Sequence, residues 1–142
     1  MKYTQSGNTY VLVLQKGEEI VSALTTFATQ TNLTCAQVSG IGATDEAEMG
    51  VFDTFEKQYY TKQIKAMTEI TALNGNITQK DGKPYVHLHA TLATMFDVVG
   101  GHLNKAVVSA TAELFVTAYP IATNRQFDSS IGINLLTWGE EK

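Results

Sequence analysis

The three histidines of this chain fall within sixteen consecutive positions. His87 and His89 stand two residues apart in a segment, 85–92, whose apolar residues alternate as they do along a β-strand. Alternate side chains of a strand share a face, so these two imidazoles, about 6.6 Å apart along the strand, can converge on one ion. Neutral imidazole suits zinc, with a nitrogen–metal distance of about 2.0 Å.

The third histidine, His102, follows Gly100-Gly101, and two glycines let the backbone turn tightly and approach another element closely. Thirteen positions lead from His89 to His102, enough to finish a strand, turn and return antiparallel beside it. We therefore predict that His87, His89 and His102 hold one divalent metal ion, zinc or a similar one. The spacing by itself fits surface histidines or hydrogen-bonded core histidines equally well.

Glu113 is the next candidate for chemistry, because it lies inside a predicted strand, 107–119, that is otherwise free of charge. A carboxylate in such a strand is costly unless it is hydrogen-bonded, paired or bound to metal. Glu113 is therefore a candidate fourth ligand, a hydrogen-bond acceptor for an imidazole N–H, or a catalytic acid/base. The alternative is a satisfied carboxylate that faces solvent or a polar cavity.

Three further features carry weaker signals. The single cysteine, Cys35, cannot form an intramolecular disulfide, and a buried free thiol in a reducing compartment is favoured over a nucleophile. The segment Ser39-Gly40-Ile41-Gly42 lacks the continuation of a phosphate loop, which favours a tight turn between strands. Arg125 and Asp128 are candidates to pair with each other or to anchor an anion, with solvated loop charges as the alternative.

The elements that must position these residues are mostly strands. One amphipathic helix is predicted from Gly17 to Thr31, because Ile20, Leu24 and Phe27 recur at helical spacing after two glutamates. The pair Asp81-Gly82 predicts a hairpin turn. With one further short helix, the pattern indicates an α+β fold. The predicted strands cover 10–14, 33–41, 46–52, 58–64, 68–77 with a break at 74–76, 85–93, 106–119 and 132–138.

Length and charge narrow the function classes. The 142 residues fit a single domain, 1–142, and need no disulfide or metal to fold. Fourteen acidic residues against ten basic ones give a net charge of −4, so autonomous specific DNA binding is not expected unless a protein partner supplies contacts. The N-terminus lacks the apolar core of a signal peptide and no apolar run could span a bilayer, so we expect a cytoplasmic protein.

Taken together, the motifs resemble the plant-and-prokaryote-conserved (PPC) domain family over almost the whole chain, from about Tyr10 to Leu136. Two departures stand out: Ala106, where the family commonly has glycine, and Phe96-Asp97, which lacks the usual glycine. The resemblance is carried by Gly17-Glu18-Glu19, Ser39-Gly40-Ile41-Gly42-Ala43, Leu73-Asn74-Gly75-Asn76-Ile77, Asp81-Gly82-Lys83-Pro84, His87-Leu88-His89-Ala90, Gly100-Gly101-His102-Leu103, Thr111-x-Glu113, Arg125, Asp128 and Gly132.

The resemblance implies a strongly curved, largely antiparallel sheet flanked by about two helices, and a homotrimer. In some prokaryotic members, the histidines that match His87, His89 and His102 hold a metal ion. Plant members join the domain to an AT-hook and act as nuclear DNA-binding regulators, but this chain has no Arg-Gly-Arg-Pro hook. The favoured function is a trimeric zinc-binding module with a regulatory or small-molecule ligand-binding role.

The alternative function is a zinc-dependent enzyme of lyase or hydrolase type, with Glu113 as acid/base. Three histidine ligands leave one position on zinc open for water or a carbonyl. The expected fold is also distantly similar to that of acetolactate decarboxylases, whose zinc is held by histidines. Fold analogy does not establish function, so the binding module ranks first.

Overall fold

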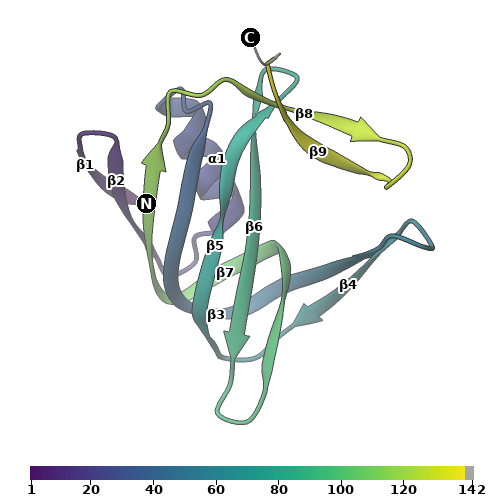
Figure 1. The fold of residues 1–142 in the computed structure, drawn as a ribbon. Helices are drawn as coiled ribbons and strands as arrows, with labels where there is room; N and C mark the ends of the chain where they lie inside the picture. The colour runs from purple at the N-terminus through teal and green to yellow at the C-terminus, as the bar shows by residue number, and fades with distance from the viewer. Residues whose placement is uncertain (140–142) are drawn as a thin grey trace.

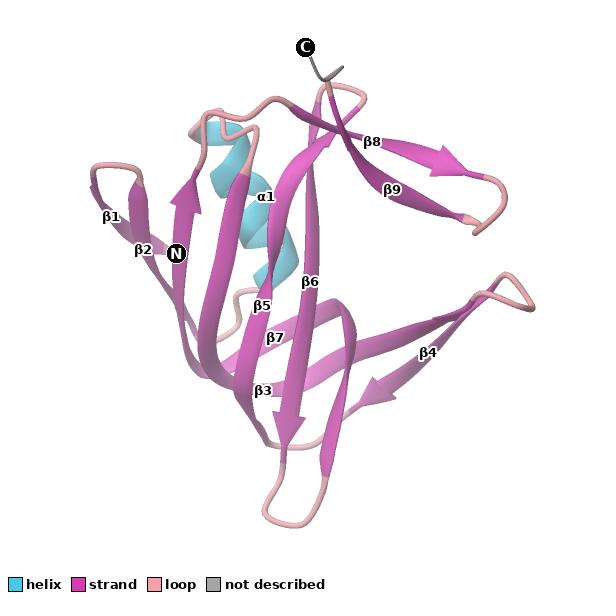
Figure 2. Cartoon of the chain, in the orientation of Figure 1, coloured by secondary structure: helices cyan, strands magenta, loops and turns pink. Residues whose placement is uncertain are grey.

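The computed structural model of the chain describes residues 1–139 and consists mainly of antiparallel strands with one helix (Figures 1 and 2). The hydrogen-bonded order of the main sheet is β1-β2-β7-β6-β5-β3-β4, and β7 also pairs with β3, so that β3, β5, β6 and β7 pair in a closed cycle. A second sheet is the hairpin β8-β9. The strands are β1 (Lys2–Ser6), β2 (Thr9–Gln15), β3 (Ala36–Asp53), β4 (Gln58–Ile64), β5 (Thr68–Lys80), β6 (Lys83–Ala93), β7 (Val98–Ala118), β8 (Thr123–Asp128) and β9 (Ile133–Trp138).

The predicted helix is confirmed as α1 (Ile20–Gln30). It begins where the Glu19 carboxylate accepts hydrogen bonds from the backbone N–H groups of Val21 and Ser22, which satisfies two of the free donors of the first turn. The helix packs against β6 and β7. Its completely buried side chains are Ile20, Leu24, Phe27 and Ala28, and each large one contributes about 2 kcal/mol through removal from water.

Two strand breaks that the sequence predicts are wrong. The chain runs from Ala36 to Asp53 as one strand, because the expected interruption after Gly42 is absorbed by register shifts against β5 and β7. A Cβ at Gly40 would lie 2.6 Å from the Glu113 carbonyl oxygen, so the glycines of this motif allow close strand packing rather than a turn. Likewise, β5 continues through 74–76 without a break.

The expected second helix is absent from residues 1–139, and the exposed polar strands β1 and β8 were not expected. The expected strong curvature of the sheet stays a prediction. Because α1 has only 11 residues and no other helix is described in 1–139, the described chain contains no candidate for a membrane-spanning helix.

Two hairpins project to the same side of the molecule, the outer part of β3-β4 and the separate β8-β9 (Figure 1). Their tips are in contact, since the Lys57 ammonium donates a hydrogen bond of 2.8 Å to the Ser129 carbonyl oxygen. The Phe52 ring also lies close to Gly132, because a Cβ added to this glycine would be 3.1 Å from Phe52 Cζ. The space between these hairpins and β6 is where the histidines lie.

Candidate metal centre

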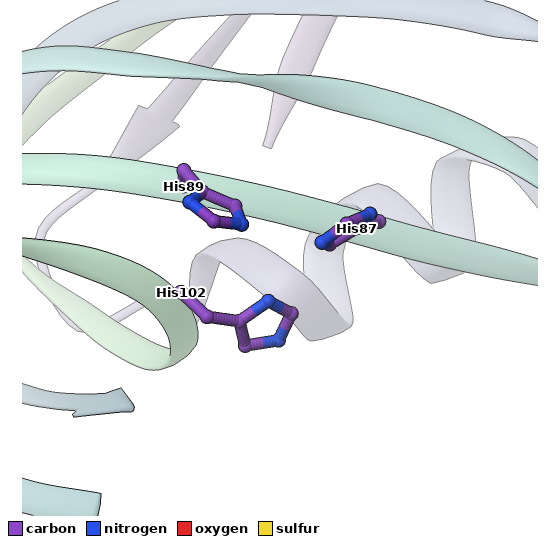
Figure 3. Close-up of side chains that lie close together, drawn as sticks. All are labelled: His87, His89 and His102. Atoms are coloured by element: carbon purple, nitrogen blue, oxygen red, sulfur yellow. The ribbon is translucent and has the colours of Figure 1, made fainter. Parts of the chain in front are cut away.

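The structure brings the three predicted histidines together. His89 is the direct cross-strand partner of His102 in the β6-β7 ladder, and His87 is two residues further along the same face of β6. Figure 3 shows the three imidazoles gathered at one place, with ring centroids 5.0 to 5.5 Å apart. The buried Leu88 between the two β6 histidines holds the opposite face of the strand in the core.

The spacing of the imidazole nitrogens suits one divalent ion. One nitrogen of each ring lies within 4.8 Å of the chosen nitrogen of the others. Ligands at about 2.0 Å around a tetrahedral ion are roughly 3.3 Å apart, so the nitrogens would have to move closer together to hold zinc. His87 and His102 are half-buried and His89 is exposed, which leaves the cluster accessible from one side.

Burial and nearby positive charges favour the uncharged form of His87 and His102. Burial is the main cause that lowers the pKa of His87 from its ordinary 6.5 to about 4, and the charges of Arg125, His102 and His89 contribute to the same shift. Burial also lowers the pKa of His102, with smaller contributions from His89 and Arg125. Both imidazoles are therefore neutral at pH 7, and a neutral imidazole is the form that binds metal.

We expect the metal-free protein to lose stability as the pH falls from about 6.5 to 4. The folded pKa of His87 is about 4 and its ordinary value is 6.5, so the unfolded chain binds more protons throughout this window. Because the ring is only half-buried, the loss from this residue should be roughly 1–2 kcal/mol after solvent screening. Urea unfolding at several pH values, in the presence of chelator, measures it. His87→Gln should flatten the pH dependence, and an unchanged slope would contradict the assignment.

The histidines line a cavity of about 670 Å³, within the usual size range of small-molecule sites. Its walls come from β6, from β7 and from both strands of each projecting hairpin, and they are largely aromatic and aliphatic. Among residues 1–139, Arg125 is the only charged residue that lines it, and no aspartate or glutamate of that range does. The lining residues are Gly50, Val51, Phe52, Tyr59, Tyr85, His87, His89, Gly101, His102, Arg125, Phe127, Gly132, Ile133 and Asn134.

Arg125 is buried at 7% exposure and connects β8 to the main sheet. Its Nε donates to Thr78 Oγ1 (3.0 Å), Nη1 to the Asn134 carbonyl oxygen (3.2 Å) and Nη2 to Asn76 Oδ1 (2.9 Å). Nη2 also lies 3.3 Å from His87 Nδ1. Because a guanidinium can only donate, His87 Nδ1 accepts this hydrogen bond and the proton of the neutral ring is on Nε2.

The guanidinium carbon of Arg125 also lies 4.6 Å from the centre of the Tyr85 ring, a cation–π contact. The sequence suggested a solvated loop charge for Arg125, or an ion pair with Asp128. In the structure, Arg125 is buried and this ion pair is not formed. Instead, Asp128 Oδ1 accepts from the backbone N–H groups of Ser130 and Ile131 and closes its own turn. In the structure Arg125 lies on the same face of β8 as Phe127, which also lines the cavity, but no apolar alternation in the sequence marks β8 as a strand.

A family model and a solved structure both place this chain in one protein family. The Plants and Prokaryotes Conserved (PCC) domain model matches residues 1–120. The chain belongs to this family. The resemblance to the PPC domain is thereby confirmed, since a crystal structure of a plant- and prokaryote-conserved (PPC) protein from Pyrococcus horikoshii matches with a TM-score of 0.85 at 30% identity, over 99% of this chain and 96% of that one. No curated protein is similar enough to this chain to count as a match.

Two other solved PCC-domain relatives bear on function. A metal-containing protein from Archaeoglobus fulgidus matches with a TM-score of 0.86 at 33% identity, over 99% of this chain and all of that one. A protein described as putative DNA-binding, from Bacteroides thetaiotaomicron, matches with a TM-score of 0.93 at 29% identity, over 96% of each chain.

In this PCC domain, Glu113 does not join the histidines. It is exposed on the outer face of β7, opposite Val13 of β2 and Ile41 of β3. It lines a separate hollow with Thr111 and Glu69, and that hollow shares no residue with the histidine cavity. Within one chain, the structure therefore fits the solvent-facing alternative for Glu113.

Cys35, which the sequence favoured as a buried free thiol, is only partly buried. Burial is nevertheless the main cause that raises the pKa of its thiol, which disfavours the thiolate that a nucleophile needs.

Proposed function

We propose that the chain is a trimeric metal-binding module of the cytoplasm, in which His87, His89 and His102 hold one zinc or similar divalent ion that takes part in binding a small ligand. The observation that carries this proposal is the convergence of three imidazoles on the wall of a 670 Å³ cavity. The metal-containing relative from A. fulgidus, at 33% identity, supports it. Three histidine ligands leave one position of a tetrahedral ion open toward the cavity.

A native mass spectrum combined with elemental analysis tests both parts of the proposal in one sample. We expect about one divalent ion per chain in protein purified without chelator, and an assembly mass of three chains. Protein that carries no metal after incubation with zinc would refute the metal site.

The trimer is supported by an apolar surface on the sheet face opposite α1. Around Glu113, the side chains of Val13, Ile41 and Phe115 are 41%, 56% and 51% exposed on three neighbouring strands. Large apolar residues gathered on one exposed face indicate a protein contact, and a closed rotational assembly satisfies such a face.

We therefore expect Phe115→Lys to break the assembly, because it removes an aromatic side chain from this face and replaces it with a charged one. Light scattering should give three times the 15.5 kDa chain mass for the natural protein and the single-chain mass for the variant at micromolar concentration. Phe55→Lys, at a 97% exposed position in the β3-β4 turn, is the matched control and should leave the mass unchanged. A natural protein of 15.5 kDa would refute the trimer.

An open metal position supports the alternative function, a zinc-dependent lyase or hydrolase, but its proposed acid/base is not at the metal site. The open metal position could polarise a carbonyl or activate water. The proposed acid/base, Glu113, however, lies outside the cavity, and no other carboxylate of residues 1–139 lines it. The binding role therefore ranks first.

For DNA, we expect no specific binding of duplex by the protein alone at physiological salt, although some relatives are described as putative DNA-binding. Specific readers position themselves through several Lys or Arg contacts to phosphates. This chain has a net charge of −4, which assembly would multiply, and its one described helix contains no basic residue. Anisotropy titration with random and AT-rich duplexes is the measurement. Binding tighter than about a micromolar at 150 mM salt, competed by only some sequences, would contradict the expectation.

A further inference from the structure

The cavity has an unbalanced positive charge once the proposed metal is bound. The ion brings two positive charges and Arg125 brings one, whereas the three histidines are neutral ligands and no carboxylate of the described residues lines the walls. Charges in a partly dry cavity are costly unless an opposite charge is close. We propose that this site binds a small organic carboxylate, whose negative charge is shared between the metal and Arg125. The proposal rests on the metal site proposed above.

Arg125 is well placed for this role because it borders directly on the metal ligands. Its Nη2 is 3.3 Å from His87 Nδ1, with Nδ1 as acceptor. A neutral imidazole has a single nitrogen lone pair, so a ring that ligates metal through either nitrogen cannot also accept from Arg125. Metal binding by His87 would therefore break the hydrogen bond from Arg125 Nη2, and one N–H of the guanidinium would be free at the edge of the cluster. A carboxylate oxygen is the acceptor that suits it.

The rest of the guanidinium is held in position by protein. Its bonds to Thr78, Asn134 and Asn76 fix the plane of the group, and Tyr85 covers one face of it. A donor that is already immobilised loses little conformational entropy when the ligand binds, which favours affinity.

The walls of the cavity indicate what the carboxylate is attached to. Val51, Phe52, Phe127 and Ile133 from the two hairpins, together with the ring of Tyr59, surround the site with apolar surface. A hydrated inorganic anion such as phosphate would have nothing to bury against these walls. An acid with an aromatic or branched aliphatic body would bury its apolar part and leave its carboxylate at the metal and Arg125.

The test uses the full-length protein loaded with Co²⁺, whose visible absorption reports ligands that reach the metal. Benzoate is the probe, benzamide is its neutral counterpart of the same shape, and inorganic phosphate is the anion without an apolar body. We expect calorimetry to show benzoate binding at least tenfold tighter than benzamide or phosphate, with a change in the cobalt spectrum. Metal-free protein should bind benzoate at least tenfold more weakly.

Arg125→Gln should weaken benzoate binding at least tenfold while the cobalt content stays at that of the natural protein. Lys62→Gln is the matched control, because it removes a cation from the same side of the molecule, on β4, at an exposed position outside the cavity lining. If circular dichroism shows that Arg125→Gln does not fold, the comparison of benzoate with benzamide in the natural protein decides the matter.

Two failures can be told apart. Cobalt-loaded protein that binds benzamide or phosphate as tightly as benzoate would overturn the carboxylate proposal and leave the metal site intact. Protein that takes up no cobalt or zinc would overturn both proposals.

Discussion

Replacing His87, His89 and His102 together with alanine is expected to abolish stoichiometric metal binding. In residues 1–139, these histidines are the only group of three or more His, Cys, Asp or Glu side chains placed to hold a metal ion. Their ligand nitrogens lie within 4.8 Å of one another. In the natural protein, metal at a thousand times its dissociation constant should add about 4 kcal/mol to the free energy of unfolding. For a chain of this size, that is roughly 10 °C or more in melting temperature, and the triple variant should gain nothing.

Elemental analysis and thermal unfolding, each with and without added zinc, are the measurements. Chelator-treated natural protein is the control, and its melting temperature should lie close to that of the triple variant, because none of the three side chains is fully buried. Equal metal content in the natural protein and the triple variant would contradict the site. Metal that is bound but does not raise the melting temperature at this excess would mean that the unfolded chain binds it as well.

The histidine cluster could be predicted because its information is local. His87 and His89 share a strand face through simple alternation, and the distance along the chain to His102 is one that a hairpin spans. The structure adds that His102 is opposite His89 in the ladder. It also moves the turn away from Gly100-Gly101, which lie inside β7, to the segment around Thr94, whose backbone N–H donates to the Asp97 carbonyl oxygen.

Arg125 could not be assigned in this way, because its surroundings depend on distant segments. Thr78 and Asn76, which hold its guanidinium, are on β5, and no local pattern says that β8 packs there. The strand β8 is short and mostly exposed, and β1 is exposed at every residue, so neither shows the apolar alternation that reveals a half-buried strand. The same reasoning explains why α1, with its apolar stripe, was predicted to within three residues at its start and one at its end.

The missed continuity of β3 and β5 has a single physical cause. Glycines such as Gly42 and Gly75 were interpreted as turn residues, but neither has a positive φ and both stand where another strand is too close for a side chain. A Cβ at Gly42 would lie 2.7 Å from the Thr111 carbonyl oxygen of β7. A sequence cannot distinguish a glycine required by a turn from one required by a close neighbour, because the neighbour is far away in the chain.

Gly75 gives this argument a direct test, because it is paired with Leu88 of β6, between the two proposed metal ligands of that strand. A Cβ added there would lie 2.0 Å from the His87 carbonyl oxygen and 2.9 Å from Leu88 Cα, both backbone atoms that cannot rotate away. Gly75→Ala must therefore push β6 outward between its two histidines. We expect a loss of about 3 kcal/mol in unfolding free energy and at least a tenfold loss of zinc affinity, since both imidazoles are carried by the displaced segment.

Gly100→Ala is the matched control on the other side of the same site, two residues before His102. A Cβ there would lie no closer than 3.6 Å to any atom, an ordinary van der Waals contact, and the φ of Gly100 is not positive. This substitution should change stability by less than about 1 kcal/mol, with a gain expected from the lower entropy of the unfolded chain. Urea unfolding and competitive zinc titration compare the two variants. If Gly75→Ala had the same stability and the same zinc affinity as Gly100→Ala, β5 would not lie close to the His87 backbone. The position assigned to β5 beside the proposed metal site would then be wrong.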